Sequence, residues 1–241
     1  MYKTSAAYYD LLYSGKDYRE EARRLDGLIR RHTRSAGRTL LDVACGTGNH
    51  IGFLKRRYAV EGLDLEPALL AIARRKHPDV RFHRGDMERF DLGRRFDAVI
   101  CLFSAIGYMA TLPRLRRAVR TMARHLRPGG ILIIEPWLTP QRFEAGRADG
   151  IFVKGPSLKI ARMSNTRRTG RRGSILVFHH LVGERGQIRH FVERHLLGLY
   201  TLGEYAAAVR AAGLRAIVDR RGLTGRGLLI GAAPRPRRLR G

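Results

Sequence analysis

The sequence predicts a doubly wound α/β fold, in which parallel strands alternate with helices that cover both faces of one sheet. Between residues 38 and 135, short apolar runs alternate with segments whose apolar residues recur every three or four positions. The run at 96–103 (FDAVICLF) is almost entirely apolar, which is typical of a strand buried on both faces. The length of 241 residues suits one such domain with an elaboration.

The elements follow in order along the chain. Residues 17–35 place apolar side chains three and four positions apart, which predicts an amphipathic helix. A glycine loop at 45–48 separates the first predicted strand from a short helical pattern that resumes at Ile51. Predicted strands cover 38–44, 59–63, 80–83, 96–103 and 131–135, and predicted helices cover 66–76 and 112–126, the second ended by the RPGG sequence.

The rhythm changes after Pro140. Residues 151–200 contain β-rich runs separated by turns such as RRTGRRG and GERG, which predict antiparallel hairpins. A helix at 202–212 then precedes two short apolar runs, which predict a closing β-hairpin. The whole prediction is a Rossmann-like sheet of seven mostly parallel strands with a C-terminal antiparallel hairpin and an inserted antiparallel β region. We expect a core at 1–140 and 201–233, an insertion at 141–200 and a basic tail at 234–241.

The net charge of +26 is unusual, and arginine supplies 41 of the 47 basic residues. One interpretation is a polyanionic partner, because clustered basic residues bind phosphate backbones. The alternative is compositional bias, since arginines are spread over nearly every predicted helix and form runs only at 167–172 and 235–240. We favour bias and treat nucleic-acid binding as a less favoured alternative.

The two cysteines and the hydropathy pattern indicate a cytoplasmic protein. Cys45 and Cys101 lie in different apolar runs, so they predict neither a disulfide framework nor a zinc cluster. The sequence has no apolar run of about 18 residues and no apolar leader pattern at its start, so we expect no membrane association.

Polar groups and glycines follow three successive predicted strands. The loop at 42–48 (DVACGTG) allows a ligand to approach the backbone closely, because glycine has no side chain to block it. Asp64 ends the second strand, where a carboxylate can accept both ribose hydroxyls of a nucleoside. Asp86 and Met87 follow the third strand, where they can accept an adenine amino group and cover its ring. These groups predict a nucleoside site at the carboxyl edge of the sheet.

In this order and spacing, the motifs resemble the class I S-adenosylmethionine-dependent methyltransferases. A nicotinamide-dinucleotide enzyme is disfavoured, because Ile51 occupies the third glycine position of G-x-G-x-x-G. The segments YYDLLYSGKDY, LLDVACGTGNH, VEGLDLE, GDMERFDLGRRFDAVICLFSAIGY, LRPGGILIIEPW and TGRGL are similar to those of the N,N-dimethyltransferases of nucleoside-diphosphate 3-amino-sugars in desosamine and mycaminose biosynthesis. That resemblance covers almost the whole chain and is weakest in the insertion.

The resemblance implies S-adenosylmethionine as the cofactor and the 3-amino group of a nucleotide-linked deoxyamino sugar as the acceptor. The insertion would cover the sugar nucleotide and help to form a homodimer. The expected cofactor-binding residues are Tyr9, Tyr18, Asp42, Ala44, Gly46, Gly48, Asp64, Leu65, Asp86, Met87, Cys101 and Phe103. For the substrate we expect contacts from Trp137, at the end of the fifth strand, and phosphate contacts from Arg162 and Arg226.

The expected catalytic residues are Tyr2 and Tyr108. The sugar enzymes read SSIGH where this chain has SAIGY, so Tyr108 replaces a histidine that lines the amine site in that family. A neutral amine needs no strong base, so a phenol can orient it and relay the released proton through water. No metal site is expected.

Two further questions stay open from the sequence. Four histidines, His179, His180, His190 and His195, lie on the insertion strands and could face the acceptor pocket. The alternatives to an amino-sugar enzyme are a methyltransferase for another small amine or hydroxyl, and an RNA-binding protein or RNA methyltransferase.

Overall fold

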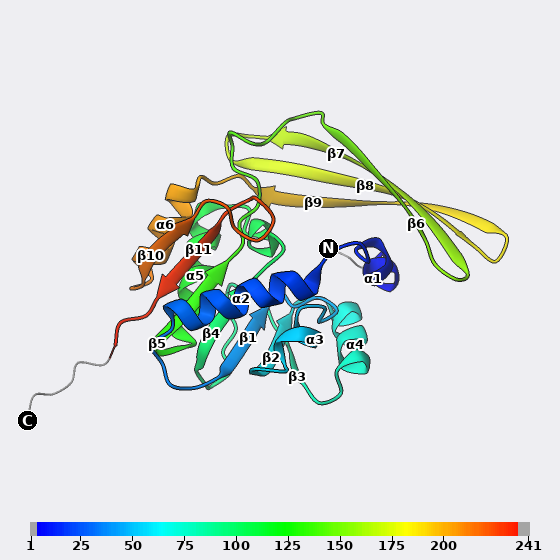
Figure 1. The fold of residues 1–241 in the computed structure, drawn as a ribbon. Helices are drawn as coiled ribbons and strands as arrows, with labels where there is room; N and C mark the ends of the chain where they lie inside the picture. The colour runs from blue at the N-terminus through cyan, green and yellow to red at the C-terminus, as the bar shows by residue number, and fades with distance from the viewer. Residues whose placement is uncertain (1–3, 236–241) are drawn as a thin grey trace, which may run out of the picture.

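The computed structural model describes residues 4–235 and contains two sheets (Figure 1). The larger sheet has the strand order β10-β11-β5-β4-β1-β2-β3. Its strands are β1 (Thr39–Val43), β2 (Ala59–Asp64), β3 (Arg81–Arg84), β4 (Phe96–Cys101), β5 (Leu126–Ile134), β10 (Arg215–Asp219) and β11 (Leu228–Ala232). The first five strands pair in parallel, and β11 runs antiparallel to both β5 and β10. The predicted fold class is confirmed.

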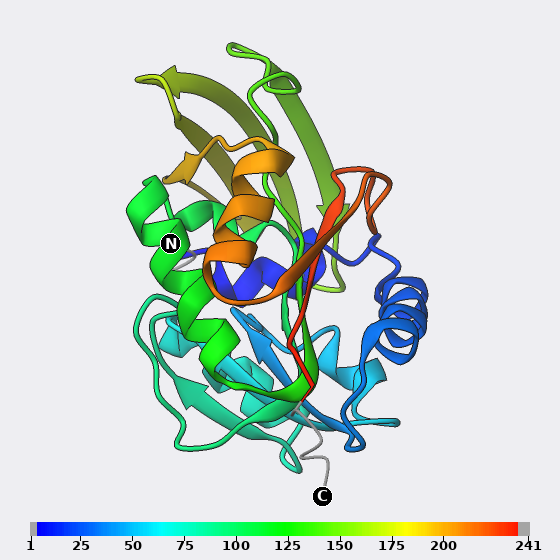
Figure 2. The ribbon, with the colours of Figure 1, turned by 90° about the vertical axis from the view of Figure 1, so that its left-hand side faces the viewer.

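Helices cover both faces of this sheet, as Figure 2 shows from its edge. The helices are α2 (Tyr18–His32), α3 (Ile51–Leu54), α4 (Pro67–Lys76), α5 (Leu112–Arg124) and α6 (Leu202–Ala211). Alternate residues of β1 explain the two layers, since successive strand side chains point to opposite faces. Leu40 joins a buried cluster with Leu25 of α2, whereas Leu41 joins a different one with Leu115 of α5.

Two of the boundaries that differ from the prediction have a clear structural cause. Strand β5 begins at Leu126, before the RPGG sequence, because its pairing with β4 shifts register between Phe96 and Ala98. Gly129, with φ +77°, lies in that irregular stretch. The RPGG sequence therefore interrupts the pairing of β5 with β4 locally, but it does not shift the start of β5. Strand β4 ends at Cys101 rather than at 103, because Phe103 and Ser104 adopt φ values of +52° and +60°.

The smaller sheet is the inserted antiparallel β region. Its strands, in the order β6-β7-β8-β9, are β6 (Ala148–Lys154), β7 (Leu158–Thr169), β8 (Gly173–Glu184) and β9 (Gln187–Gly198). Figure 1 shows this sheet lying over one end of the core, where β9 contacts the short helix η2 (Ala105–Tyr108) that follows β4. The sheet therefore lies over the carboxyl ends of the parallel strands.

The N-terminal elements η1 (Ala6–Tyr8) and α1 (Tyr9–Leu12) pack under the smaller sheet. Leu12 of α1 forms a buried apolar cluster with Ile160 of β7 and Val182 of β8. Among residues 4–235, no helix combines the length and the apolar character that crossing a membrane requires.

Candidate active site

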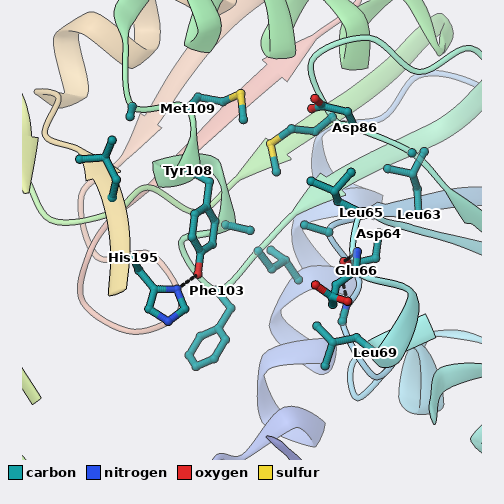
Figure 3. A pocket seen from close by; sticks show the side chains of 18 of the residues that line it. Leu63, Asp64, Leu65, Glu66, Leu69, Asp86, Phe103, Tyr108, Met109 and His195 are labelled. Atoms are coloured by element: carbon teal, nitrogen blue, oxygen red, sulfur yellow. Dashed lines mark hydrogen bonds between the residues drawn. The ribbon is translucent and has the colours of Figure 1, made fainter. Parts of the chain in front are cut away.

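A cavity of about 330 Å³ lies between the carboxyl ends of the core strands and β9. Figure 3 shows its two walls. Residues that follow β1, β2 and β3 form one wall, and η2 with β9 forms the other. A cavity of this size at this edge of an open α/β sheet is the usual position of a small-molecule site in such folds.

The glycine loop that follows β1 forms part of the first wall. Ala44, Gly46 and Gly48 have φ values of +60°, +56° and +76°, which lie in the left-handed region. The loop therefore turns sharply and brings its backbone to the cavity at Ala44 and Gly46. Gly48 does not line the cavity, and its carbonyl oxygen forms a hydrogen bond with Nε2 of His77.

Asp64 connects this loop to the end of β2. Its Oδ2 accepts the Gly46 N–H at 2.8 Å and its Oδ1 accepts the Glu66 N–H at 2.8 Å. A carboxylate has about four acceptor positions, so it can still accept hydroxyls from a ligand in the cavity. Burial raises the pKa of the Asp64 carboxyl above its ordinary value, and the two backbone hydrogen bonds oppose that effect.

Most of the predicted cofactor residues meet at this cavity. Those that line it are Tyr9, Ala44, Gly46, Asp64, Leu65, Asp86, Met87 and Phe103. The cavity offers the backbone of the glycine loop, the Asp64 carboxylate as an acceptor for ribose hydroxyls, and Asp86 with the Met87 thioether for an adenine ring. This set of groups suits S-adenosylmethionine. These residues would hold that cofactor, and their individual roles stay predictions.

The other four predicted cofactor residues lie outside the lining. Besides Gly48, these are Tyr18, at the start of α2, and the core residues Asp42 and Cys101. Asp42 is 2% exposed, and burial together with the charge of Asp64 raises its pKa to about 8. The sequence pattern predicts Asp42 and Cys101 near the site, but both side chains are buried in the protein core instead of lining the cavity.

The opposite wall carries Tyr108 and His195. Their hydroxyl oxygen and Nδ1 share a hydrogen bond of 2.6 Å, drawn as a dashed line in Figure 3. Both residues line the cavity, so the predicted catalytic tyrosine does reach it. Tyr2, the other predicted catalytic residue, lies outside the described residues.

The register of the smaller sheet separates the four candidate histidines. His180 and His195 point inward and are buried, while His179 and His190 point outward and stack at 5.6 Å on the exposed face. Strand alternation tells which histidines share a face, but not which face of the smaller sheet is turned toward the cavity. That choice requires the pairing of β8 with β9, so the sequence could not single out His195. The strand alternation itself was the available signal.

A buried carboxylate shapes the turn that leads to Tyr108. Glu135 is fully buried, and it accepts the Phe103 N–H at 2.7 Å and the Thr224 hydroxyl at 2.6 Å. Because Phe103 and Ser104 have positive φ values, this turn needs such a fixed acceptor. Glu135 was not among the predicted site residues.

The N-terminal segment closes the cavity. Asp10 accepts hydrogen bonds from Thr47 at 2.5 Å and Asn49 at 3.1 Å, and it pairs with Lys76 at 2.8 Å. At the other end of the segment, Ser5 donates to Glu193 of β9 at 2.6 Å. The segment thus links the glycine loop to the smaller sheet and holds Tyr9 at the cavity.

The three predicted substrate residues lie near the cavity without lining it. The Arg226 guanidinium lies 5.2 Å from the centre of the Trp137 ring and donates to the Ser104 hydroxyl at 2.8 Å. Arg162 donates to the Tyr13 hydroxyl at 3.0 Å and lies over Phe178. Their roles in substrate binding stay predictions.

Sequence reasoning also missed several lining residues, most of them apolar. They are Leu63, Glu66, Leu69, Gly85, Leu102, Ala105, Met109, Ala110, Arg114, Arg194 and Leu196. Within the described part of the chain, no group of three or more histidine, cysteine or acidic side chains is arranged to hold a metal ion.

The chain is similar in sequence to known methyltransferases. Residues 40–130 match the family model described as a methyltransferase domain. The chain is 42% identical over 197 residues to the dTDP-3-amino-3,6-dideoxy-alpha-D-glucopyranose N,N-dimethyltransferase of Streptomyces fradiae, covering 80% of this chain and 77% of the relative. It is 41% identical to the dTDP-3-amino-3,4,6-trideoxy-alpha-D-glucopyranose N,N-dimethyltransferase of Streptomyces venezuelae, covering 79% and 81%.

Solved structures agree with the sequence relatives. The crystal structure of Streptomyces venezuelae DesVI has a TM-score of 0.87 at 41% identity and covers 94% of this chain and 96% of its own. CalS10 of Micromonospora echinaspora, described as an amino pentose methyltransferase with bound SAM, has a TM-score of 0.83 at 43% identity and covers 95% of each chain.

Proposed function

This chain belongs to the family of the S-adenosylmethionine-dependent amino-sugar N,N-dimethyltransferases, and we propose that it methylates the 3-amino group of a nucleotide-linked deoxyamino sugar. One observation supports this proposal above the others. A single cavity has the glycine loop, Asp64 and Asp86 on one wall and the Tyr108–His195 pair on the other. A nucleoside-bearing cofactor and an acceptor can therefore meet inside one site.

The chemistry needs positioning more than strong acid–base groups. S-adenosylmethionine supplies a methyl group on a positively charged sulfur, which a neutral amine can attack in line. Apolar residues such as Leu102 and Met109 exclude water from the reacting atoms. Tyr108 can direct the lone pair of the amine by a hydrogen bond, and we assign it that role first.

We assign the substrate contacts by position. Trp137 and Arg226 form a cation–π pair beside η2, and Arg162 lies on the inner face of the smaller sheet, opposite His180. A guanidinium at either position suits a diphosphate, because its planar donors bind two oxygens at once. We propose that the insertion at 141–200 is the substrate lid and that Tyr2 completes the acceptor site.

We also propose a homodimer that forms through the outer face of the smaller sheet. Four of the large apolar side chains on that face are strongly exposed: Phe152 (59%), Met163 (55%), Leu181 (48%) and Ile188 (78%). We call them the outer apolar patch. They share one face by the register of β6 to β9, and a second copy would remove this surface from water. For the compartment we retain the cytoplasm, supported by the two free cysteines.

The test is methyl transfer from S-adenosylmethionine, followed by mass spectrometry of each acceptor. The panel contains dTDP-linked 3-amino sugars, simple amines and bulk tRNA. We expect one and then two CH₂ increments on the amino sugar. Labelling of tRNA alone would replace the proposal with the RNA methyltransferase alternative, and labelling of simple amines alone would remove the nucleotide-linked acceptor.

A further inference from the structure

We propose that Tyr108 and His195, with the Glu193 carboxylate beside them as a fixed charge, form a proton relay that removes the proton of the acceptor ammonium before each methyl transfer. The inference rests on the proposed function, because it concerns an amine bound at the same site. It assigns a role to His195, which the sequence offered only as one of four candidate histidines, and to Glu193, which the sequence did not point to.

The geometry places the three groups in a row. The Tyr108 hydroxyl lies 2.6 Å from His195 Nδ1, and His195 Nε2 lies 3.8 Å from Glu193 Oε2. Tyr108 and His195 line the cavity, and His195 is only 2% exposed. A proton that leaves the acceptor at Tyr108 can thus be replaced by transfer of the Tyr108 proton to His195, with the Glu193 carboxylate on the far side of the ring.

Glu193 supplies a fixed negative charge at the end of the row. Its oxygens accept the Ser5 hydroxyl at 2.6 Å, the Ser5 N–H at 3.1 Å and the Thr4 N–H at 3.2 Å. Although burial acts to raise it, the pKa of Glu193 is lowered to about 2 by His195 and by the Ser5 hydrogen bonds. The carboxylate therefore stays charged and places a negative charge beside His195 Nε2.

The other groups near Glu193 do not neutralise it. His180 Nε2 lies 3.8 Å from the same Oε2, but burial lowers the pKa of His180 to about 4, so its ring is neutral at pH 7. Arg162 lies over Phe178, whose ring packs at 5.2 Å from His195, and it donates to Tyr13. The charge of Glu193 is therefore available to His195.

The relay solves a protonation problem. A sugar amine is largely an ammonium ion at neutral pH, and an ammonium has no lone pair with which to attack. The ammonium N–H bond breaks toward the Tyr108 oxygen while the Tyr108 proton passes to His195 Nδ1. The neutral amine then forms its bond to the methyl carbon as the carbon–sulfur bond breaks and leaves its electron pair on sulfur.

The same demand returns for the second methyl group. The product of the first transfer is a monomethyl ammonium, which must lose a proton before it attacks again. His195 must return its proton to solvent between the two steps. A chain with a damaged relay is thus expected to stop more often after one methyl group.

The experiment compares His195→Gln, His195→Ala and Tyr108→Phe with wild-type protein, and uses His32→Gln as a control far from the cavity. We expect His195→Gln to lower kcat by about 10- to 100-fold and to raise the share of monomethyl product, with an unchanged Kd for S-adenosylmethionine. Free imidazole should restore part of the activity of His195→Ala. His32→Gln should behave as wild type.

A second measurement does not depend on the acceptor. In ¹⁵N-labelled protein the Tyr108 hydrogen bond should hold neutral His195 as the Nε2–H tautomer, and Tyr108→Phe should change the ¹⁵N shift of His195 Nδ1. The relay is overturned if His195→Gln keeps wild-type kcat and product ratio, or if the Nδ1 shift is unmoved by Tyr108→Phe. By contrast, wild-type protein that binds S-adenosylmethionine but methylates no amino sugar would overturn the proposed function alone.

Discussion

At the residue scale, the site depends on carboxylates held in unusual surroundings. Asp42 and Asp64 end or nearly end adjacent strands, and burial raises the pKa of both. Glu135 is fully buried and the Glu193 side chain is mostly buried, but both are held by donors from neighbouring segments. We therefore expect the first two carboxylates and the last two to respond differently to substitution and to pH.

For Asp42 the prediction concerns stability. Its folded-state pKa of about 8 lies above its ordinary value of 3.8, so between these pH values the folded protein binds a proton that the unfolded chain has lost. Stability therefore falls as pH rises through this window. We expect Asp42→Asn to reduce that fall, so that its Tm relative to wild type is higher at pH 8.5 than at pH 5. Parallel Tm curves for the two proteins, measured by calorimetry, would contradict the prediction.

For Asp64 the prediction concerns cofactor affinity. Asp64→Asn keeps the shape but supplies one acceptor oxygen instead of two, so the Gly46 and Glu66 N–H groups compete with the ribose hydroxyls for it. We expect the Kd for S-adenosylmethionine to rise by about tenfold or more, measured by titration calorimetry. Asp79→Asn, at an exposed pair with Lys55, is the matched control. An unchanged Kd would remove Asp64 from the cofactor site.

At the scale of elements, the turn after β4 is held by Glu135, which directly follows β5 and accepts a hydrogen bond from the loop before β11. Glu135→Ala would remove the acceptor of the part-buried Phe103 N–H and of the hydroxyl of Thr224, an exposed residue. We expect the free energy of unfolding to fall by about 2 to 4 kcal/mol, measured by urea denaturation. Glu135→Gln should lose less, because its amide oxygen still serves one donor. Equal stability of the alanine variant and wild type would show that the turn does not need this acceptor.

The N-terminal segment is the other element that completes the site. Asp10→Ala removes its contacts to Thr47, Asn49 and Lys76. We expect faster amide hydrogen exchange in residues 4–12 and faster dissociation of S-adenosylmethionine by a few fold, with the core exchange unchanged. Glu20→Ala, which loses only an exposed pair with Arg23, provides the control. Unchanged exchange at residues 4–12 would show that Asp10 does not hold the segment.

The sequence predicted elements better than it predicted which side chains meet. The core strands were predictable, because their apolar runs and terminal glycines and acids report burial and turns locally. The start of β5 was not, because the shifted pairing at Phe96 and Ala98 depends on a neighbouring strand. His195 was weighed only as one of four histidines, since the face it occupies follows from the register of β8 and β9.

At the scale of the whole molecule, the outer apolar patch decides the predicted assembly. Ile188 is 78% exposed, so Ile188→Lys should change the stability of the monomer little. In a dimer, the same substitution would place a charge in an apolar interface. We expect wild-type protein to be a dimer by light scattering and Ile188→Lys to shift it toward monomer. Arg221→Lys, on a loop of the core outside this patch, is the control. A monomeric wild-type protein at micromolar concentration would contradict the homodimer.

The charge of +26 has its own test at this scale. If it reflects composition, tRNA should bind weakly and the binding should vanish near physiological salt, because spread charges contact few phosphates at once. Binding that persists there with a steep salt dependence would instead support a polyanionic partner. Fluorescence anisotropy over a series of salt concentrations distinguishes the two.

The most direct measurement compares two acceptors that differ only at the reacting group. Initial rates are measured with S-adenosylmethionine and either a dTDP-linked 3-amino-deoxy sugar or the same dTDP sugar with a hydroxyl at that carbon. We expect rapid formation of mono- and dimethyl amine and no detectable ether, because Tyr108 and His195 provide no strong base for an alcohol. Faster methylation of the hydroxyl sugar than of the amino sugar would contradict it.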